Sequence, residues 1–223
     1  MVMSFFRGGG NGLEHIEKQM ALMLAEARHS FDLAMSPLVL GVDPATIKDE
    51  VHLTDERINK AEKEVRRLLL VHATVRGAED MATVLAYLLL VKKIERIGDQ
   101  AKNILDLAQE GASFTSADDA DELRRFGTVI STAFGEVLGL LQEPDERAAA
   151  EFRKRADELS AEAETALRQL IHSSRPAADA VPRALFNRYV KRIAANLGGI
   201  ASSLIDPLDH IDYREGGTVD TDD

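Results

Sequence analysis

The sequence predicts an all-α protein in which six helices form two tandem three-helix bundles. Apolar residues recur at steps of three and four along almost the whole 223-residue chain, and no segment alternates convincingly between apolar and polar residues. A polar break at residues 113–119 separates three helical segments from three more. The apolar fraction of 45% and the charged fraction of 29% are those of an ordinary globular protein.

The first two predicted helices have boundaries set by proline and by polar residues. The first covers residues 13–35 and ends before Pro37, because a proline disfavours helical geometry in the residue that precedes it. The second begins near residues 43–44, or after a break at residues 54–55, and runs to residue 73. The remaining four helices end or begin at glycines, prolines or polar stretches, and cover residues 78–109, 119–142, 145–172 and 182–205.

The two halves of the chain, residues 13–111 and 118–206, resemble each other. The segment AEKEVRRLLLVH at 61–72 aligns with AEAETALRQLIH at 161–172, and IERIGDQAKNI at 94–104 aligns with VKRIAANLGGI. The order and separation of these matches indicate a tandem repeat. We expect residues 1–12 to form a flexible leader and the acidic residues 207–223 to form a disordered tail.

Charge and hydropathy exclude several function classes. The formal net charge of −11 disfavours direct nucleic-acid binding, which needs a basic face for phosphates. The longest apolar run, residues 84–91, is far shorter than the roughly 20 residues that a membrane-spanning helix needs. The start of the chain has no signal-peptide pattern, and cysteine is absent, so a cytoplasmic protein without thiolate metal ligands is expected.

The third predicted helix carries two carboxylates where apolar residues are expected. Val84, Leu88 and Val91 form a stripe at helical spacing, and Glu95 and Asp99 continue the same stripe. Two ionised carboxylates on one row repel each other, and a bound cation would reverse the sign of that interaction. Because Glu95 and Asp99 continue the apolar stripe, they belong to the face of this helix that meets other helices.

The second predicted helix carries a matching row of oxygen ligands, Asp55, Asn59 and Glu62. A short connection makes the second and third helices antiparallel neighbours, so the two rows could face each other. Carboxylate and amide oxygens are hard ligands that suit Mg, Ca, Mn or Fe. Gly98, which has no Cβ, would let the neighbouring helix approach closely. The alternative is that these residues are simply a solvated acidic face.

The segment ERIGDQAKNI, preceded by a helix that contains DERIN, resembles the PhoU family of phosphate-uptake regulators. The resemblance covers residues 50–110 and implies two packed three-helix bundles with iron or another divalent metal, such as Mn, Mg or Zn, on the carboxylate faces. Carried over residue by residue, it implies that the metal ligands are Asp55, Asn59, Glu95, Asp99 and Asn103.

The resemblance also implies the partners and the mode of action. It predicts a non-enzymatic, cytoplasmic negative regulator of phosphate homeostasis that contacts the ATPase of the phosphate ABC transporter and the phosphate-sensing histidine kinase. A homodimer is expected, with membrane association only through partners. Two rival hypotheses remain: a carboxylate-bridged di-metal enzyme of the ferritin type, and a structural helical partner protein without metal. The ferritin type needs a Glu-x-x-His on each of two facing helices, and the sequence has a single one, from Glu26 to His29.

The second half departs from the family pattern at the ligand positions. In the repeat alignment Lys191 stands opposite Glu95, Ala195 opposite Asp99, and Gly199 opposite Asn103. A lysine offers only hydrogen-bond donors and repels a cation. The sequence therefore predicts metal binding in the first half alone.

Overall fold

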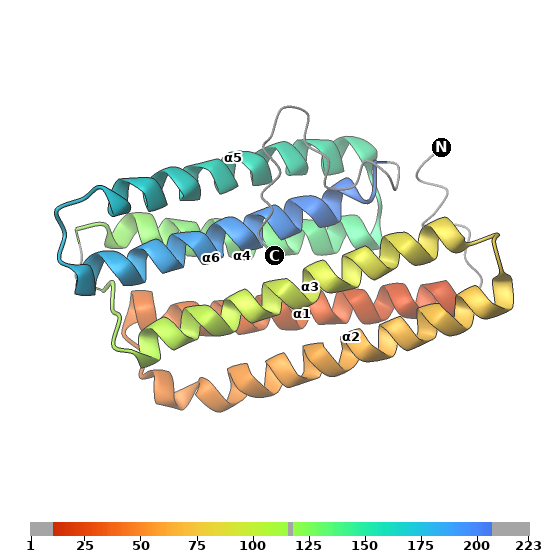
Figure 1. Ribbon diagram of the computed structural model, residues 1–223, viewed down its shortest axis with the longest axis horizontal. Coiled ribbons are helices and arrows are strands. Elements are labelled where there is room, and N and C mark those ends of the chain that lie inside the picture. Colours follow the sequence, from red (N-terminus) through yellow and green to blue (C-terminus); the bar gives the residue numbers. More distant parts are fainter. Residues whose placement is uncertain (1–10, 116–117, 207–223) are drawn as a thin grey trace.

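The computed structural model describes residues 11–115 and 118–206, and within them every long element is an α-helix (Figure 1). The all-α prediction is confirmed. The elements in chain order are α1 (Asn11–Leu40), the short 3₁₀ helix η2 (Pro44–Thr46), α2 (Lys48–Arg76), α3 (Met81–Gln109), α4 (Ala120–Gln142), α5 (Glu146–Ile171) and α6 (Ala177–Ser202).

The six helices pack as two groups of three that lie against each other (Figure 1). Helices α1, α2 and α3 all contact one another closely. Helix α5 packs along the length of α6, whereas α4 touches α5 only slightly and packs mainly against α1 and α6. Contacts of α6 with α3 and of α4 with α1 join the two groups. The second group is therefore less closed than the first.

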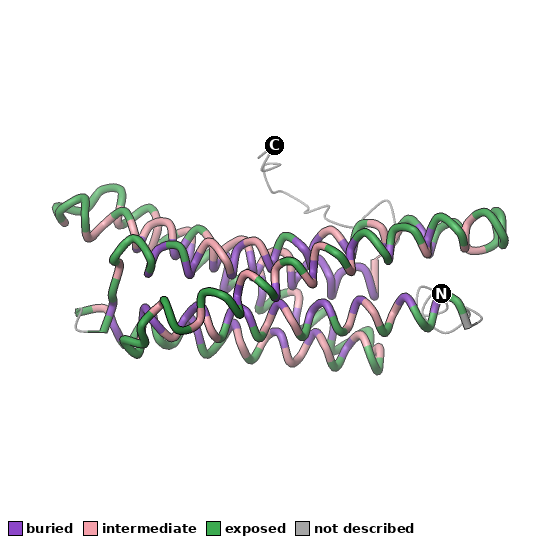
Figure 2. The backbone as a smooth tube through the Cα atoms, turned by 90° about the horizontal axis from the view of Figure 1, so that it is seen from below, coloured by how far each residue is buried: buried purple, intermediate pink, exposed green. Residues whose placement is uncertain are grey.

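One hydrophobic core runs through both groups, and the buried residues line the inner faces of the helices (Figure 2). The ring centroids of Phe31 on α1 and Phe134 on α4 are 5.8 Å apart, and those of Phe114 and Phe186 are 5.7 Å apart. All four rings are buried. The first pair connects the two halves of the chain, and the second packs the segment between α3 and α4 against α6, so the two halves share their core.

Helix α1 does not end before Pro37 as the sequence predicted; it continues to Leu40. A proline inside a helix has no N–H to donate to the carbonyl four residues earlier, here that of Leu33. The hydroxyl of Ser36 donates to this carbonyl instead, at 2.8 Å. The last turn also buries Leu38, whose carbonyl accepts a hydrogen bond from the backbone N–H of Phe114 at 2.8 Å.

Two other boundaries differ from the prediction. Helix α2 begins at Lys48 and has no break at residues 54–55, where the hydroxyl of Thr54 donates to the carbonyl of Glu50 at 2.7 Å. Helix α6 begins at Ala177 instead of Pro182, directly after Pro176. Pro182 thus lies inside the helix, and Pro176 is the proline that stands at its N-cap.

The predicted flexible leader lies mostly outside the described residues, and the predicted disordered tail lies wholly outside them. Among the helices that the structure describes, none is both long and apolar enough to span a bilayer.

Candidate functional site

The two carboxylates of α3 lie on its inner side, as the sequence predicted. Glu95 is 9% exposed and sits among buried residues of the same helix. Asp99, one turn later, is half-buried. The row of apolar residues that leads to them, represented by Val84 and Val91, is buried in the core.

The acidic row of α2 faces the acidic row of α3 along this antiparallel pair of helices, as contacts between the two rows show. Near one end of the contact, Nζ of Lys102 on α3 donates to Oδ2 of Asp55 on α2 at 3.2 Å, and Nδ2 of Asn59 donates to the same oxygen at 3.3 Å. Near the other end, Nζ of Lys92 on α3 lies 3.9 Å from Oε1 of Glu62 on α2. The predicted juxtaposition of the two rows is therefore present.

Asp99 lies between the other carboxylates and feels their charge. Burial raises the pKa of its carboxyl above the ordinary value, and the negative charges of Glu95 and Asp55 raise it further. The ammonium groups of Lys102 and Lys92 act in the opposite direction and lower it in part. The neighbouring negative charges disfavour the ionised form of this acid, so a cation bound nearby would stabilise that form strongly.

Two lysines belong to this face and were missing from the prediction, and Glu62, which was predicted in the row of the second helix, belongs to it as well. Nζ of Lys92 lies 2.6 Å from Oε2 of Glu95, and Lys102 pairs with Asp55 as described. Lys92 precedes Glu95 by three residues and Lys102 follows Asp99 by three, so helical spacing could have revealed both. We define the acidic face as Asp55, Asn59, Glu62, Lys92, Glu95, Asp99 and Lys102.

Gly98 brings α2 and α3 together beside this face. A Cβ built on Gly98 would lie 3.0 Å from Cδ1 and 3.6 Å from Cγ2 of Ile58 on α2. The absence of a side chain thus permits the close approach that the sequence suggested, and it keeps the two rows of the acidic face near each other.

A comparison with protein families shows that residues 20–108 match the PhoU domain, and this range contains the entire acidic face. The first group of helices therefore carries a PhoU domain. The match ends within the last turn of α3, so it lies on the first group of helices.

Solved structures of PhoU proteins share the fold of this chain over both groups of helices. PhoU from Pseudomonas aeruginosa is 22% identical in sequence, with a TM-score of 0.74 over 86% of this chain and 95% of that one. The phosphate transport system regulatory protein PhoU from Streptococcus pneumoniae is 12% identical, with a TM-score of 0.75 over 86% and 92% of the two chains. No curated protein matches the sequence.

The acidic face has donor atoms of the kind that a hard metal ion takes. Oε1 of Glu62 and Oε2 of Glu95 are buried and make no hydrogen bond of good geometry, although each lies close to a cationic side chain. These contacts are ion pairs that leave carboxylate lone pairs available. Within the described ranges, however, no three His, Asp or Glu side chains already converge on one point. The face therefore offers oxygen donors of the kind that a hard metal ion takes, and Arg66 and Lys92 contact two of them in this structure.

Asn103 takes a less central place than the other four predicted ligands. It lies one turn beyond Asp99 on α3 and is partly exposed. Asp55, Asn59, Glu95 and Asp99 are the predicted residues that the antiparallel pairing of α2 and α3 brings to a common face.

The corresponding face of the second group is neutralised by ion pairs. Nζ of Lys191 on α6 lies 3.1 Å from Oε2 of Glu164 on α5. Hydrogen bonds from Arg168 and Lys191 lower the pKa of the Glu164 carboxyl. The lysine that replaces Glu95 in the repeat alignment thus already supplies a cation to this face.

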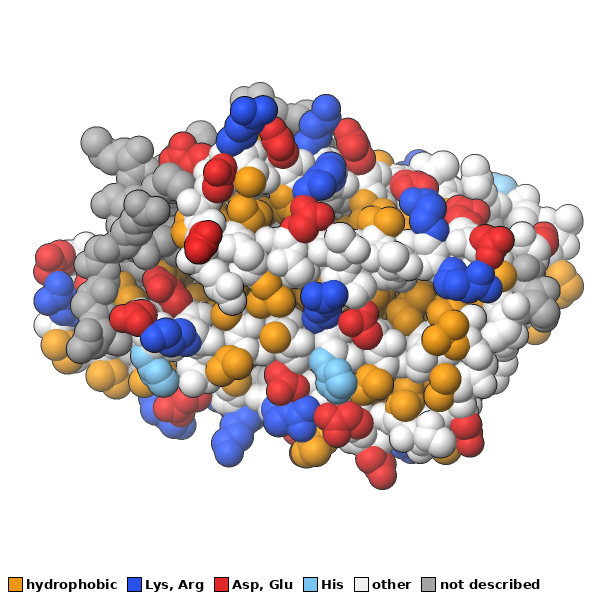
Figure 3. Space-filling view, turned by 180° about the vertical axis from the view of Figure 1, so that it is seen from behind, with side chains coloured by type: hydrophobic (Ala, Val, Ile, Leu, Met, Phe, Trp, Pro, Cys, Tyr) orange, Lys and Arg blue, Asp and Glu red, His pale blue; other side chains and the backbone are white. Residues whose placement is uncertain are grey.

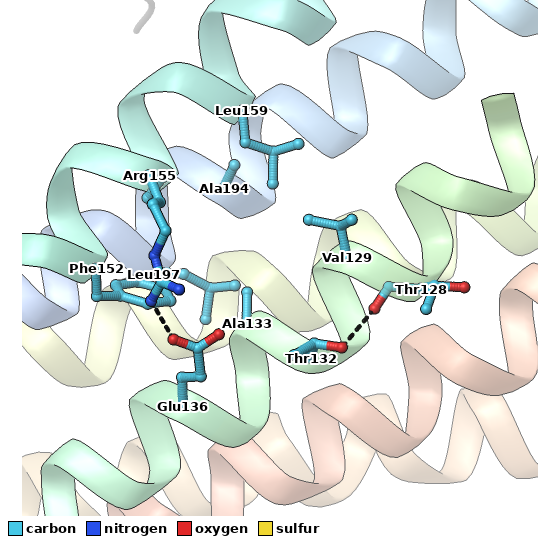
Figure 4. A pocket seen from close by; sticks show the side chains of 11 residues that line it. Thr128, Val129, Thr132, Ala133, Glu136, Phe152, Arg155, Leu159, Ala194 and Leu197 are labelled. Carbon is cyan, nitrogen blue, oxygen red and sulfur yellow. Dashed lines mark hydrogen bonds and ion pairs between the residues drawn. The ribbon is translucent and has the colours of Figure 1, made fainter.

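The slight contact between α4 and α5 leaves an apolar slot of about 180 Å³, with α6 as its third wall (Figure 4). Val129 and Ala133 line it from α4, and Phe152 and Leu159 from α5. The ion pair between Arg155 and Glu136 crosses the slot, so the polar groups shown there satisfy each other.

Charged side chains are mixed over the surface. On the face seen in Figure 3, acidic and basic side chains alternate between apolar areas. Many of them form ion pairs one turn apart on the same helix, such as Lys18 with Glu14 at 2.6 Å and Arg147 with Glu151 at 3.0 Å. Such exposed pairs contribute little stability, about 0–1 kcal/mol each.

Proposed function

We propose that this chain belongs to the PhoU family and is a negative regulator of phosphate uptake and of phosphate-responsive signalling in the cytoplasm. It acts by contacting the ATPase of the phosphate ABC transporter and the phosphate-sensing histidine kinase. The observation that carries the proposal is the match of residues 20–108 to the PhoU domain, which includes the paired helices α2 and α3. The regulatory role named for the Streptococcus pneumoniae structure supports it.

An apolar surface at the turn between α2 and α3 supports a role in protein contacts. Leu70 and Val75 on α2 are 69% and 77% exposed, and Leu85 and Leu89 on α3 are each 43% exposed. Several large apolar side chains exposed together mark interaction surfaces more often than isolated ones do. This end of the molecule is our candidate for a contact with the regulated machinery.

Deletion of the gene in the organism that carries it tests the proposal. We expect the deletion to raise phosphate uptake and phosphate-starvation transcription in phosphate-replete medium, and affinity capture of the full-length chain to recover the transporter ATPase or the kinase. Unchanged uptake and transcription after deletion would contradict the proposed function. We also propose a homodimer, which sedimentation showing only a 24.5 kDa species at micromolar concentration would exclude.

We further propose that the acidic face binds iron or another divalent ion, with Asp55, Asn59, Glu95 and Asp99 as ligands and Asn103 beside them. The buried carboxylate oxygens and the raised pKa of Asp99 support this assignment. When bound, the ion would supply positive charge that neutralises the acidic face. In the metal-bound state the ligands of α2 and α3 would hold these two helices together, and Lys92 and Lys102 would turn away from the carboxylates towards solvent.

The double variant Glu95→Gln, Asp99→Asn tests the metal site. A ligand that binds only the native state raises its stability by RT ln(1 + [L]/Kd), so about 2.7 kcal/mol is expected at a hundredfold excess over Kd. Added Mn²⁺ or Fe²⁺ should raise the Tm of the wild type and not that of the double variant. The matched control is Asp106→Asn, Glu110→Gln, an exposed pair with the same spacing at the end of α3, where Glu110 is the C-cap. Equal metal-induced shifts in the wild type and the double variant would exclude this site.

A further inference from the structure

A polar cavity of about 190 Å³ lies at the end of the molecule where α5 turns into α6. Its walls come from the start of α4, the end of α5, the segment between α5 and α6, and α6 itself. It is smaller than the roughly 300–1,000 Å³ of pockets for drug-sized ligands, so it suits a small group. It lies on the second group of helices, away from the acidic face.

The floor of this cavity contains a buried acceptor without a donor. Asn187 on α6 is 3% exposed, and its Nδ2 donates to the backbone carbonyl of Arg183 at 2.9 Å. A carbonyl can only accept, so this bond fixes the orientation of the amide. Oδ1 of Asn187 accepts no hydrogen bond within the described part of the chain. A group that binds there must therefore donate a hydrogen bond.

The charged side chains around the cavity favour a cation. Arg183 donates to both carboxylate oxygens of Asp119, from Nε at 2.8 Å and from Nη2 at 3.2 Å. Arg175 donates to Asp118 at 2.8 and 2.9 Å and to Asp179 at 2.9 Å. Both guanidinium groups are thus engaged by carboxylates.

One further carboxylate, Glu122, lines the cavity on the first turn of α4 and forms no ion pair among the described residues. With Glu122, four carboxylates in this region meet two guanidinium groups, which leaves an excess of negative charge. Leu123, Phe126 and Leu170 supply apolar wall between Glu122 and the buried Asn187. The cavity therefore combines an acceptor on its floor, an apolar wall and a negative charge.

We propose that this cavity binds a primary ammonium group on a short aliphatic chain. The ammonium donates to Oδ1 of Asn187 and is attracted by Glu122, while the methylene groups pack against Leu123 and Leu170. Such a group occurs on a free aliphatic amine and on a lysine side chain of a protein partner, and the chemistry of recognition is the same for both. The proposal is independent of the proposed regulatory function.

The position equivalent to this cavity in the first group of helices has a different lining. A cavity between the start of α1 and the end of α2 is bounded mainly by apolar residues, including Ile16, Leu68 and Val75. His72, which lines it, is paired with Asp80 at 2.9 Å. The buried unpaired acceptor is thus particular to the second cavity.

Titration of the full-length protein with n-butylammonium, followed by amide NMR, tests the proposal. We expect saturable shifts of the Asn187 side-chain amide and of Ser173, which also lines the cavity. Tetramethylammonium has the same charge and no donor, so it should give no such shifts. The dissociation constant of n-butylammonium should rise at least tenfold in Asn187→Leu and also in Glu122→Gln. The second variant tests the proposal even if Asn187→Leu does not fold. Glu143→Gln, at the other end of α4, is the matched control and should bind like the wild type.

Shifts that fail to saturate, that occur equally with tetramethylammonium, or that persist in Asn187→Leu and Glu122→Gln would overturn the proposal. A second titration with N-acetyl-lysine-methylamide distinguishes the sources of the ammonium group. Comparable affinity for this probe supports a lysine side chain as the occupant, whereas binding of n-butylammonium alone supports a free amine.

Discussion

Replacement of Lys92 by methionine tests how far the acidic face depends on its own lysines. Nζ of Lys92 lies 2.6 Å from Glu95 and 3.9 Å from Glu62, and the side chains of these two glutamates are only 11% and 9% exposed. Methionine preserves most of the apolar stem of lysine and removes the charge. Without metal, the variant therefore leaves two nearly buried carboxylates with less compensation.

The expected cost follows from the burial of the partners. Removing one member of a buried ion pair costs about 3–5 kcal/mol, whereas exposed pairs contribute about 0–1 kcal/mol. Lys92 is 39% exposed, so we expect a value between these limits, about 2 kcal/mol. For a chain of this size, 1 kcal/mol changes Tm by about 2–4 °C, which gives a fall of roughly 4–8 °C.

Calorimetry without metal and with added Mn²⁺ measures both consequences. Lys63→Met, at an exposed position of α2, is the control and should leave Tm within about 1 °C of the wild type. If a metal ion binds the acidic face, it competes with the ammonium of Lys92, so the metal-induced rise in Tm should be larger in Lys92→Met than in the wild type. A Lys92→Met protein as stable as Lys63→Met would refute the argument from ion pairing.

Two further predictions concern pH and the proline in α1. The raised pKa of Asp99 means that its ionised form destabilises the fold, so Asp99→Asn should raise the metal-free stability at pH 7. This gain should shrink as the pH falls through the raised pKa, and it should vanish below the ordinary value of 3.8. Urea unfolding at several pH values measures it. A gain that is constant with pH would contradict this cause. Ser36→Ala should cost about 1–2 kcal/mol in the wild type and much less beside Pro37→Ala, since the restored N–H can donate to the carbonyl of Leu33; equal costs in a double-mutant cycle would show that the hydroxyl does not replace the missing donor.

The helices and their packing could be predicted from hydrophobic spacing, because each helix buries one side. The stripe of α3 that includes Val84, Val91 and Glu95 indicated its buried face correctly. The end of α1 could not be predicted by the rule for proline, since that rule considers the backbone alone. The side chain of Ser36 supplies the missing donor, and sequence spacing gives no measure of that contact.

The composition of the acidic face was only partly predictable. The motifs identified the carboxylates, and the antiparallel pairing of α2 and α3 followed from a short connection. Whether Lys92 and Lys102 point at the carboxylates or at solvent depends on side-chain conformations, which helical spacing does not determine. The assignment of a metal to this face stays a prediction.

The cavity around Asn187 could not be predicted from sequence at all. Asn187 is one polar residue in a helix that contains many, and its unpaired oxygen becomes apparent only when α4, α5 and α6 surround it. Its lining comes from segments far apart in the sequence, such as those of Asp119 and Asn187.

The two helical hairpins point in opposite directions: the turn between α2 and α3 lies at one end of the molecule and the turn between α5 and α6 at the other (Figure 1). A helix such as α3, with 29 residues, is about 43 Å long at 1.5 Å per residue. The exposed apolar side chains near the first turn and the cavity near the second therefore lie towards opposite ends of the molecule. A partner bound at one end leaves the other end accessible, so this geometry allows two partners to bind at the same time.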